Sequence, residues 1–245
     1  MTVEDRQRTL SPAPDPELCG KDSDNDVSLW KMTWECQERP KDSRWLVAKG
    51  EKGQLLVPTD RIKGIECPEL VSGAYSDKDH NYWQVAWERA YDWFSKPPWG
   101  TFGLGINSKE ARSREQLHIH MSTVVQGVKD DLDRAYADDK IAKDLAHWPY
   151  RVVTVNGWDK EYSKRDPRIY RVLHTENLDF NLFAALHDSI ITTMGEKMAA
   201  QTLIVIAAGL SPKSGYYILN SRRDLASPRD VVQGIGYCDT LLICK

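Results

Sequence analysis

Polar and apolar residues alternate without a break along Gln116-Leu117-His118-Ile119-His120-Met121-Ser122. Successive side chains of a β-strand point to opposite faces of its sheet. The four polar residues are therefore predicted to share one face, while the three apolar residues between them enter the core. Two imidazoles on a strand that faces a cleft can work as a pair, in which one attacks a substrate and the other orients it or holds a proton.

The spacing of His118 and His120 also fits other roles. Two histidines separated by one residue on a strand can ligate zinc. A third ligand would have to come from the four remaining histidines, and no local pattern selects one of them: His80, His147, His174 and His187. The spacing alone leaves catalysis, metal binding and a structural role open.

Hydrophobic periodicity along the rest of the chain predicts an α+β fold. Helical spacing indicates helices over residues 82–94, 124–136 and 181–201. Apolar or alternating runs indicate strands over residues 45–48, 54–58, 101–106, 116–122, 152–155, 170–173, 202–208 and 216–220. A charged loop is expected over residues 159–168. Because short turns join neighbouring strands, we expect a mostly antiparallel sheet with helices packed on it.

The chain is predicted to consist of a tail and one domain. Residues 1–26 carry seven acidic residues, three basic residues and three prolines, a composition typical of disorder. We therefore expect a disordered acidic, proline-rich tail over residues 1–27. Residues 28–245 are expected to form a single domain, which opens with a short helix capped by Ser28 and is long enough to bury a core.

Charge and cysteine usage exclude several classes of protein. The net charge of −3, from 33 basic and 36 acidic residues, shows no basic excess of the kind that nucleic-acid binding uses. The five cysteines are scattered and form no CxxC pair, which argues against a disulfide framework or a structural zinc site. No apolar run could cross a bilayer, and the N-terminus lacks the features of a signal peptide. We expect a cytoplasmic protein with no nucleic-acid partner and at most peripheral membrane contact.

Several segments together resemble the CDP-diacylglycerol pyrophosphatase family. The stretch His118-Ile119-His120-Met121-Ser122 itself is similar to the strand motif of the histidine-triad superfamily, in which polar and apolar residues alternate in this way. The more specific family resemblance extends over about residues 45–240 and is carried by residues 55–66, 81–83, 86–87, 106–108, 112–113, 116–120, 202–206 and 217–221. The resemblance implies a histidine-triad-like fold, a small-molecule substrate with a pyrophosphate or similar group, no metal or other cofactor, and a homodimer.

The resemblance also implies roles for individual residues. His120 corresponds to the nucleophile, which attacks a phosphorus of the pyrophosphate and forms a phosphoramidate that water then hydrolyses. His118 corresponds to the histidine that orients it. Contacts with the phosphates and the leaving group are implied for Asn107, Arg112, Ser113, Gln116 and Ser122. Of these, Arg112 offers a guanidinium fork whose geometry suits phosphate.

Three differences from the family keep three hypotheses open. Ser122 occupies the third polar position, where triad proteins carry a further histidine, and an acidic tail stands where bacterial relatives have an export or anchor segment. The stretch Gly236-Tyr237-Cys238-Asp239 resembles the family's ending only loosely, because a histidine often precedes an Asp-Cys pair there. The first hypothesis is hydrolysis of a CDP-diacylglycerol-like nucleoside diphosphate ester. In the second, the histidine pair acts as an acid and base on a different small metabolite. In the third, the domain is a non-catalytic nucleotide-binding module.

Overall fold

The computed structural model describes residues 44–60, 62–72, 81–159, 161, 163–227 and 230–244. The predicted tail over residues 1–27 and the helix expected at Ser28 lie outside these residues. Within the described residues, no helix combines the length and the apolar character needed to cross a membrane.

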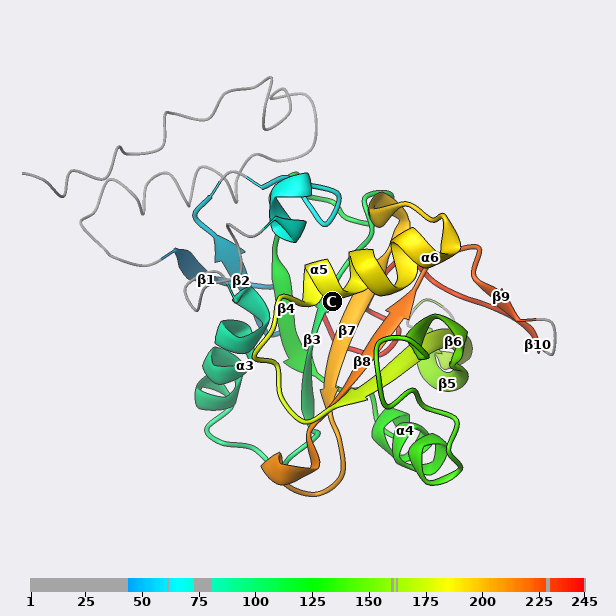
Figure 1. The fold of residues 1–245 in the computed structure, drawn as a ribbon. Coiled ribbons are helices and arrows are strands. Elements are labelled where there is room, and N and C mark those ends of the chain that lie inside the picture. Colours follow the sequence, from blue (N-terminus) through cyan, green and yellow to red (C-terminus); the bar gives the residue numbers. More distant parts are fainter. Residues whose placement is uncertain are drawn as a thin grey trace, which may run out of the picture.

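An antiparallel sheet of eight strands forms the centre of the described structure (Figure 1). Its spatial order is β1-β2-β4-β3-β7-β8-β6-β5, and every neighbouring pair runs antiparallel. The strands are β1 (Trp45–Lys49), β2 (Gln54–Pro58), β3 (Phe102–Ile106), β4 (Ile119–Thr123), β5 (Val152–Asp159), β6 (Lys164–Thr175), β7 (Thr202–Ala207) and β8 (Tyr216–Ser221). A separate pair is formed by β9 (Ala226–Ser227) and β10 (Asp230–Gln233). The α+β class and the mostly antiparallel sheet are thereby confirmed.

Helices and single helical turns connect the strands. The α-helices are α3 (Tyr82–Trp93), α4 (Val128–Ala137), α5 (Leu182–Leu186) and α6 (Thr192–Met194), and the π-helical segment η6 (His187–Ile191) joins the last two. The 3-10 turns are η2 (Pro68–Val71), η5 (Trp148–Tyr150), η7 (Met198–Ala200) and η8 (Pro212–Ser214). The side chain of Asn81 caps α3 by accepting a hydrogen bond from the Gln84 amide, which helps this helix to begin at the predicted residue.

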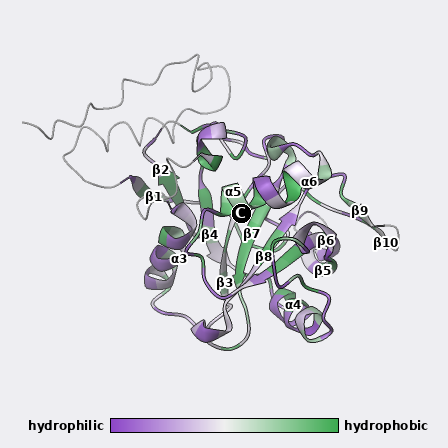
Figure 2. Ribbon diagram, viewed as in Figure 1, coloured by the Kyte–Doolittle hydropathy of each residue, from purple (hydrophilic) through white to green (hydrophobic). Residues whose placement is uncertain are grey.

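Each face of the sheet carries its own hydrophobic core. The core on one face packs α3 and α5 against the strands, and it contains Ile119 and Met121 of β4. The other core contains residues of α4 and of the segment Cys238–Cys244, hereafter the C-terminal segment. Figure 1 shows the helix through α5 and α6 in front of the central strands and the red end of the chain behind them. In Figure 2 the central strands are predominantly hydrophobic, as burial on both faces requires.

Three predicted boundaries differ from the structure for identifiable reasons. The helix expected over residues 181–201 ends at Gly195, whose φ of 64° places it in the left-handed region that commonly closes a helix. The helix expected from Val124 begins at Val128, because Val124 instead pairs with Leu242 in a β-bridge. The charged loop expected over residues 159–168 is mostly strand, since β5 and β6 continue as a paired hairpin from Asp159 and Lys164.

Candidate active site

Strand β4 separates its two kinds of side chain between the two faces of the sheet, as the alternation predicts. Ile119 and Met121 have no exposed surface and belong to the core under α3 and α5. On the opposite face, His118 and Ser122 are buried and His120 is half-buried. The regular strand is shorter than predicted, because it begins at Ile119 rather than at Gln116.

The two histidine rings lie next to each other at the start of β4. Their centroids are 5.0 Å apart and their planes are inclined by 67°, an edge-on arrangement. Nδ1 of His118 lies 2.7 Å from the main-chain oxygen of Gln116. Because a carbonyl oxygen only accepts hydrogen bonds, this contact requires a proton on Nδ1 of His118. In the neutral ring the lone pair therefore resides on Nε2.

His118 stays neutral because its surroundings oppose a positive charge. The pKa of His118 falls from 6.5 to about 3, chiefly because of burial and next because of the neighbouring His120. The guanidinium groups of Arg114 and Arg112 act in the same direction, whereas the hydrogen bond with Gln116 opposes the fall. The two guanidinium groups thus add positive potential at His118, which favours anions.

His120 presents a nitrogen with no partner among the described residues. Its Nε2 is buried and accepts or donates no hydrogen bond within that part of the chain. In the sheet, His120 pairs with Leu55 of β2 on one side and with Gly105 of β3 on the other. A buried polar atom without a partner is costly, and in native proteins it often marks a site of chemistry.

The C-terminal segment crosses the sheet on the same face as His120. A side chain at Gly105 would collide with it, since a Cβ there would lie 2.6 Å from Cβ of Cys238. The amide of Ile243 donates to the Thr123 oxygen at 2.8 Å, and the Ser122 hydroxyl donates to the oxygen of Ile243. These contacts fix the segment over β3 and along the end of β4.

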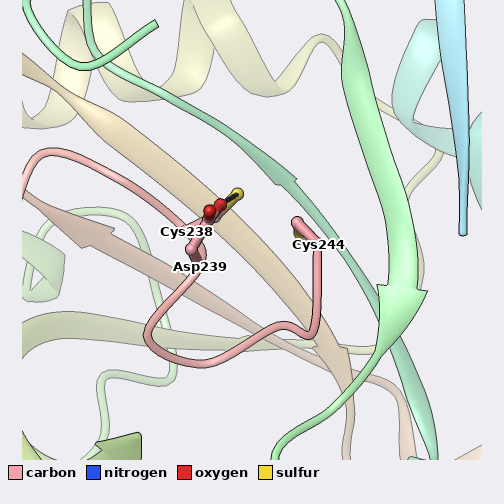
Figure 3. A group of neighbouring side chains, drawn as sticks. All are labelled: Cys238, Asp239 and Cys244. Atoms are coloured by element: carbon pink, nitrogen blue, oxygen red, sulfur yellow. Dashed lines mark hydrogen bonds between the residues drawn. The ribbon is translucent and has the colours of Figure 1, made fainter. Parts of the chain in front are cut away.

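Two cysteines and an aspartate of this segment gather in one group (Figure 3). Cys244 of this group interacts with His120. The thiol of Cys238 lies 3.8 Å from Oδ1 of Asp239. Burial raises the pKa of Cys238, and hydrogen bonding with Cys244 raises it further. Hydrogen bonding with Cys238 lowers the pKa of Cys244 against the opposing effect of burial, and the adjacent His120 imidazole lowers it further. Cys244 is therefore the more acidic thiol of the pair.

Asn107 and Gln116, two residues predicted to contact the substrate, form hydrogen bonds with main-chain groups of the protein. Oδ1 of Asn107, just after β3, accepts the amide N–H of Cys238 at 2.9 Å. The side-chain amide of Gln116 donates to the main-chain oxygens of Pro58 and Asp60, both at 3.0 Å. Asn107 thus anchors the C-terminal segment, and Gln116 anchors the entry to β4 against the end of β2.

Arg112 is engaged by carboxylates in the structure. Its guanidinium forms a two-pronged ion pair with Glu66, at 2.6 and 2.7 Å, and a further contact with Glu115 at 2.9 Å. These partners raise the pKa of Arg112 although burial alone would lower it. Direct phosphate binding by Arg112 would have to displace one of these partners. Ser113 is exposed, and the Ser122 hydroxyl is used by the C-terminal segment.

No local pattern in the sequence connects Cys238, Asp239 and Cys244 with the histidine strand. They lie more than a hundred residues away along the chain, and their spacing matches no common metal motif. The one available signal is Phe102-Gly103-Leu104-Gly105-Ile106, in which both glycines fall on the same face as His120. Alternate glycines on a buried strand indicate that another part of the chain approaches closely.

Known proteins resemble this chain along much of its length. The sequence model of the family described as CDP-diacylglycerol pyrophosphatase matches residues 31–235. A CDP-diacylglycerol pyrophosphatase from Yersinia pestis is 34% identical over 137 residues, which cover 46% of this chain and 51% of that protein. The chain thus spans about half the length of that relative. The match to the family includes the histidine strand and ends before the C-terminal segment.

Proposed function

Since this chain belongs to the CDP-diacylglycerol pyrophosphatase family, we propose that it hydrolyses the pyrophosphate bond of CDP-diacylglycerol or a similar nucleoside diphosphate ester. His120 is the nucleophile and His118 orients it. The products are a nucleoside monophosphate and a phosphate ester, which for CDP-diacylglycerol are CMP and phosphatidate.

The reaction proceeds in two displacements at the nucleoside-bearing phosphorus. Nε2 of His120 attacks that phosphorus, and the bond to the bridging oxygen breaks with its electron pair on the departing phosphate ester. The resulting nucleotidyl-histidine is then attacked by water. The phosphorus–nitrogen bond breaks, the nitrogen recovers its lone pair, and the water proton is released to solvent. The sum is one substrate and one water converted into two phosphate monoesters.

The unpartnered Nε2 of His120 is the observation that carries this proposal. A nitrogen that the described residues leave without a hydrogen bond keeps its lone pair for a substrate. The neighbouring His118 is neutral and held through its Nδ1 by the Gln116 oxygen, and its ring centroid lies 5.0 Å from that of His120, which suits an orienting role. Because Nε2 is buried, a substrate reaches it only after the residues around it move.

Electrostatics near the pair also support an anionic substrate. Cleavage of a pyrophosphate builds negative charge on oxygens, which positioned cations stabilise. Both Arg112 and Arg114 contribute positive potential at His118. Arg112 acts mainly through this potential, since Glu66 and Glu115 occupy its hydrogen-bonding positions.

The intermediate gives a direct test of the function. Purified protein is mixed with CDP-diacylglycerol in detergent, quenched with base to preserve the acid-labile phosphoramidate, and weighed by intact mass spectrometry. A protein species heavier by one cytidylyl group is expected, and it should be absent from His120→Asn. Turnover by both proteins at the same rate, with no adduct in either, would reject His120 as the nucleophile.

The ion pairs of Arg112 favour one alternative function. With its guanidinium held by two carboxylates, the site offers less charge to a pyrophosphate than the family resemblance implies. The histidine pair would then serve as acid and base on another small metabolite. In that case the base-quenched protein carries no phosphorus, and the nucleotides remain intact during prolonged incubation.

Two finer features belong to the same proposal. We place the domain, residues 28–245, in the histidine-triad-like class because the paired histidines lie at the start of one strand of an antiparallel sheet, with His120 in the strand and His118 just before it. A homodimer in the cytoplasm is the assembly and location that this class suggests. Light scattering of the purified full chain would return twice the chain mass for a dimer, and a single chain mass would reject it.

A further inference from the structure

Three metal-binding side chains meet within the C-terminal segment. One ligand atom from each of Cys238, Asp239 and Cys244 lies within 4.8 Å of the other two (Figure 3). Cys238 is fully buried and Cys244 retains 3% exposure, while Asp239 is half-buried. Two thiols and a carboxylate at this separation need only a small inward movement to share one ion.

The main chain holds the two cysteines in place from several sides. The Cys238 amide is bound by Asn107, and the Cys238 oxygen accepts the amides of Leu241 and Leu242, both at 3.0 Å, which closes a tight turn. The Cys244 oxygen accepts the Lys52 amide at 3.3 Å. A turn fixed at both ends presents its ligands with little entropy left to lose on binding.

Further contacts hold the middle of the turn. The amide of Trp158 in β5 donates to the Thr240 oxygen at 2.9 Å. Gly157, the residue before it, has no room for a side chain, because a Cβ there would lie 2.2 Å from Cγ2 of Thr240. Glycines at 105 and 157 thus allow the turn to lie close against the sheet, so that its thiols are kept away from solvent.

We propose that Cys238, Asp239 and Cys244 form a binding site for one thiophilic divalent cation, with Zn²⁺ as the best match. Thiolate sulfur selects Zn²⁺ and related ions over Mg²⁺ and Ca²⁺, which prefer oxygen ligands. Both thiols lose their protons to solvent when the ion binds. Three protein ligands leave the fourth position of a tetrahedral ion for water.

This site uses none of the side chains that we propose to act in the pyrophosphatase reaction. Its three residues lie beyond residue 235, where the match to the family ends. The nitrogen proposed to attack the substrate belongs to a different strand. A bound ion would hold the C-terminal segment on the sheet beside His120, because Cys244 contacts that imidazole.

Cobalt provides the test, since Co²⁺ replaces Zn²⁺ in thiolate sites and is coloured there. Titration of the metal-free full chain with Co²⁺ is expected to produce a sulfur-to-cobalt charge-transfer band and intense tetrahedral visible bands at one equivalent. Zn²⁺ should displace them. Cys238→Ser and Cys244→Ser should each weaken binding by more than about 100-fold, beyond the loss typical of a supporting contact, and Asp239→Asn should weaken it less.

Matched controls separate this site from the other thiols and from the catalytic proposal. A variant with Cys19, Cys36 and Cys67 all changed to serine should keep the complete cobalt spectrum. His120→Asn should also keep it while losing any hydrolase activity, so the two proposals fail separately. X-ray absorption of the zinc-loaded wild type, which needs no variant, should show two sulfur neighbours at about 2.3 Å. A sulfur-free shell, or a cobalt spectrum that survives the loss of both Cys238 and Cys244, would overturn the proposal.

Discussion

His120 lies directly opposite Gly105 in the antiparallel pairing of β4 with β3, and the missing side chain of Gly105 leaves the space that Cys238 occupies. This relationship brings the C-terminal segment to the histidine strand. The candidate active site is therefore assembled from a strand in the middle of the chain and a turn near residue 240.

Replacing Gly105 with alanine should push the C-terminal segment off the sheet. The new Cβ would lie 2.6 Å from Cys238 and 2.9 Å from Leu242, closer than real Cβ atoms approach their neighbours. We expect a loss of about 1–3 kcal/mol in the free energy of unfolding, as for other overpacked sites, measured by urea denaturation. Gly50→Ala is the matched control, because its nearest neighbour would be 3.4 Å away. Equal stability of both variants would contradict the close approach.

The depressed pKa of His118 predicts how stability depends on pH. Below pH 6.5, His118 takes up a proton in the unfolded chain, whereas in the folded protein its ring stays neutral down to about pH 3. Stability is thus complete above pH 6.5 and falls by up to about 1.4 kcal/mol per pH unit as the pH drops toward 3.

His118→Asn removes this titration and keeps a donor near the position of Nδ1. The difference in unfolding free energy between the wild type and this variant should therefore shrink, or change sign, as the pH falls from 7 to 4. Urea denaturation at each pH gives this difference directly, since other titrating groups cancel. Parallel curves for the two proteins would show that the buried neutral state of His118 has been assigned wrongly.

The assignment of faces on β4 is tested by a charge on the core side. Met121 has no exposed surface and packs in the core under α3. Met121→Asp should therefore destabilise the protein by more than about 3 kcal/mol, because it buries an unpaired carboxylate. Thr123→Asp, at an exposed position of the same strand, should change the melting temperature little. Similar melting temperatures for the two variants would mean that the side chain of Met121 does not lie in the core.

Local patterns predicted most of the fold. Alternation identified β4 and its two faces, and helical spacing identified α3 to within one residue. The strands predicted over residues 152–155 and 170–173 lie within β5 and β6. The outer end of their hairpin is predicted as a charged loop because it carries no apolar face, and its strands are defined by their pairing with each other. The early end of the helix at Gly195 depends on a backbone conformation that periodicity does not register.

The candidate site was predictable only in part. His118 and His120 follow from the alternation on a single strand, so local sequence suffices to find them. Arg112 pairs with nearby Glu115 and also with Glu66, which lies 46 residues earlier in the chain, so local sequence does not reveal that second ion pair. The approach of Cys238 to Gly105 likewise requires the complete topology, and a single sequence contains no measure of such distances.

The central claim is that His120 attacks a pyrophosphate, and a phosphorus NMR time course tests it most directly. Wild type and His120→Asn would be incubated side by side with CDP-diacylglycerol in detergent, CDP-choline and ADP-ribose, after circular dichroism has established that both are folded. We predict that the pyrophosphate resonances of at least CDP-diacylglycerol convert into two monoester resonances with the wild type only. Intact pyrophosphate in the presence of folded wild type, or equal cleavage by His120→Asn, would contradict the claim.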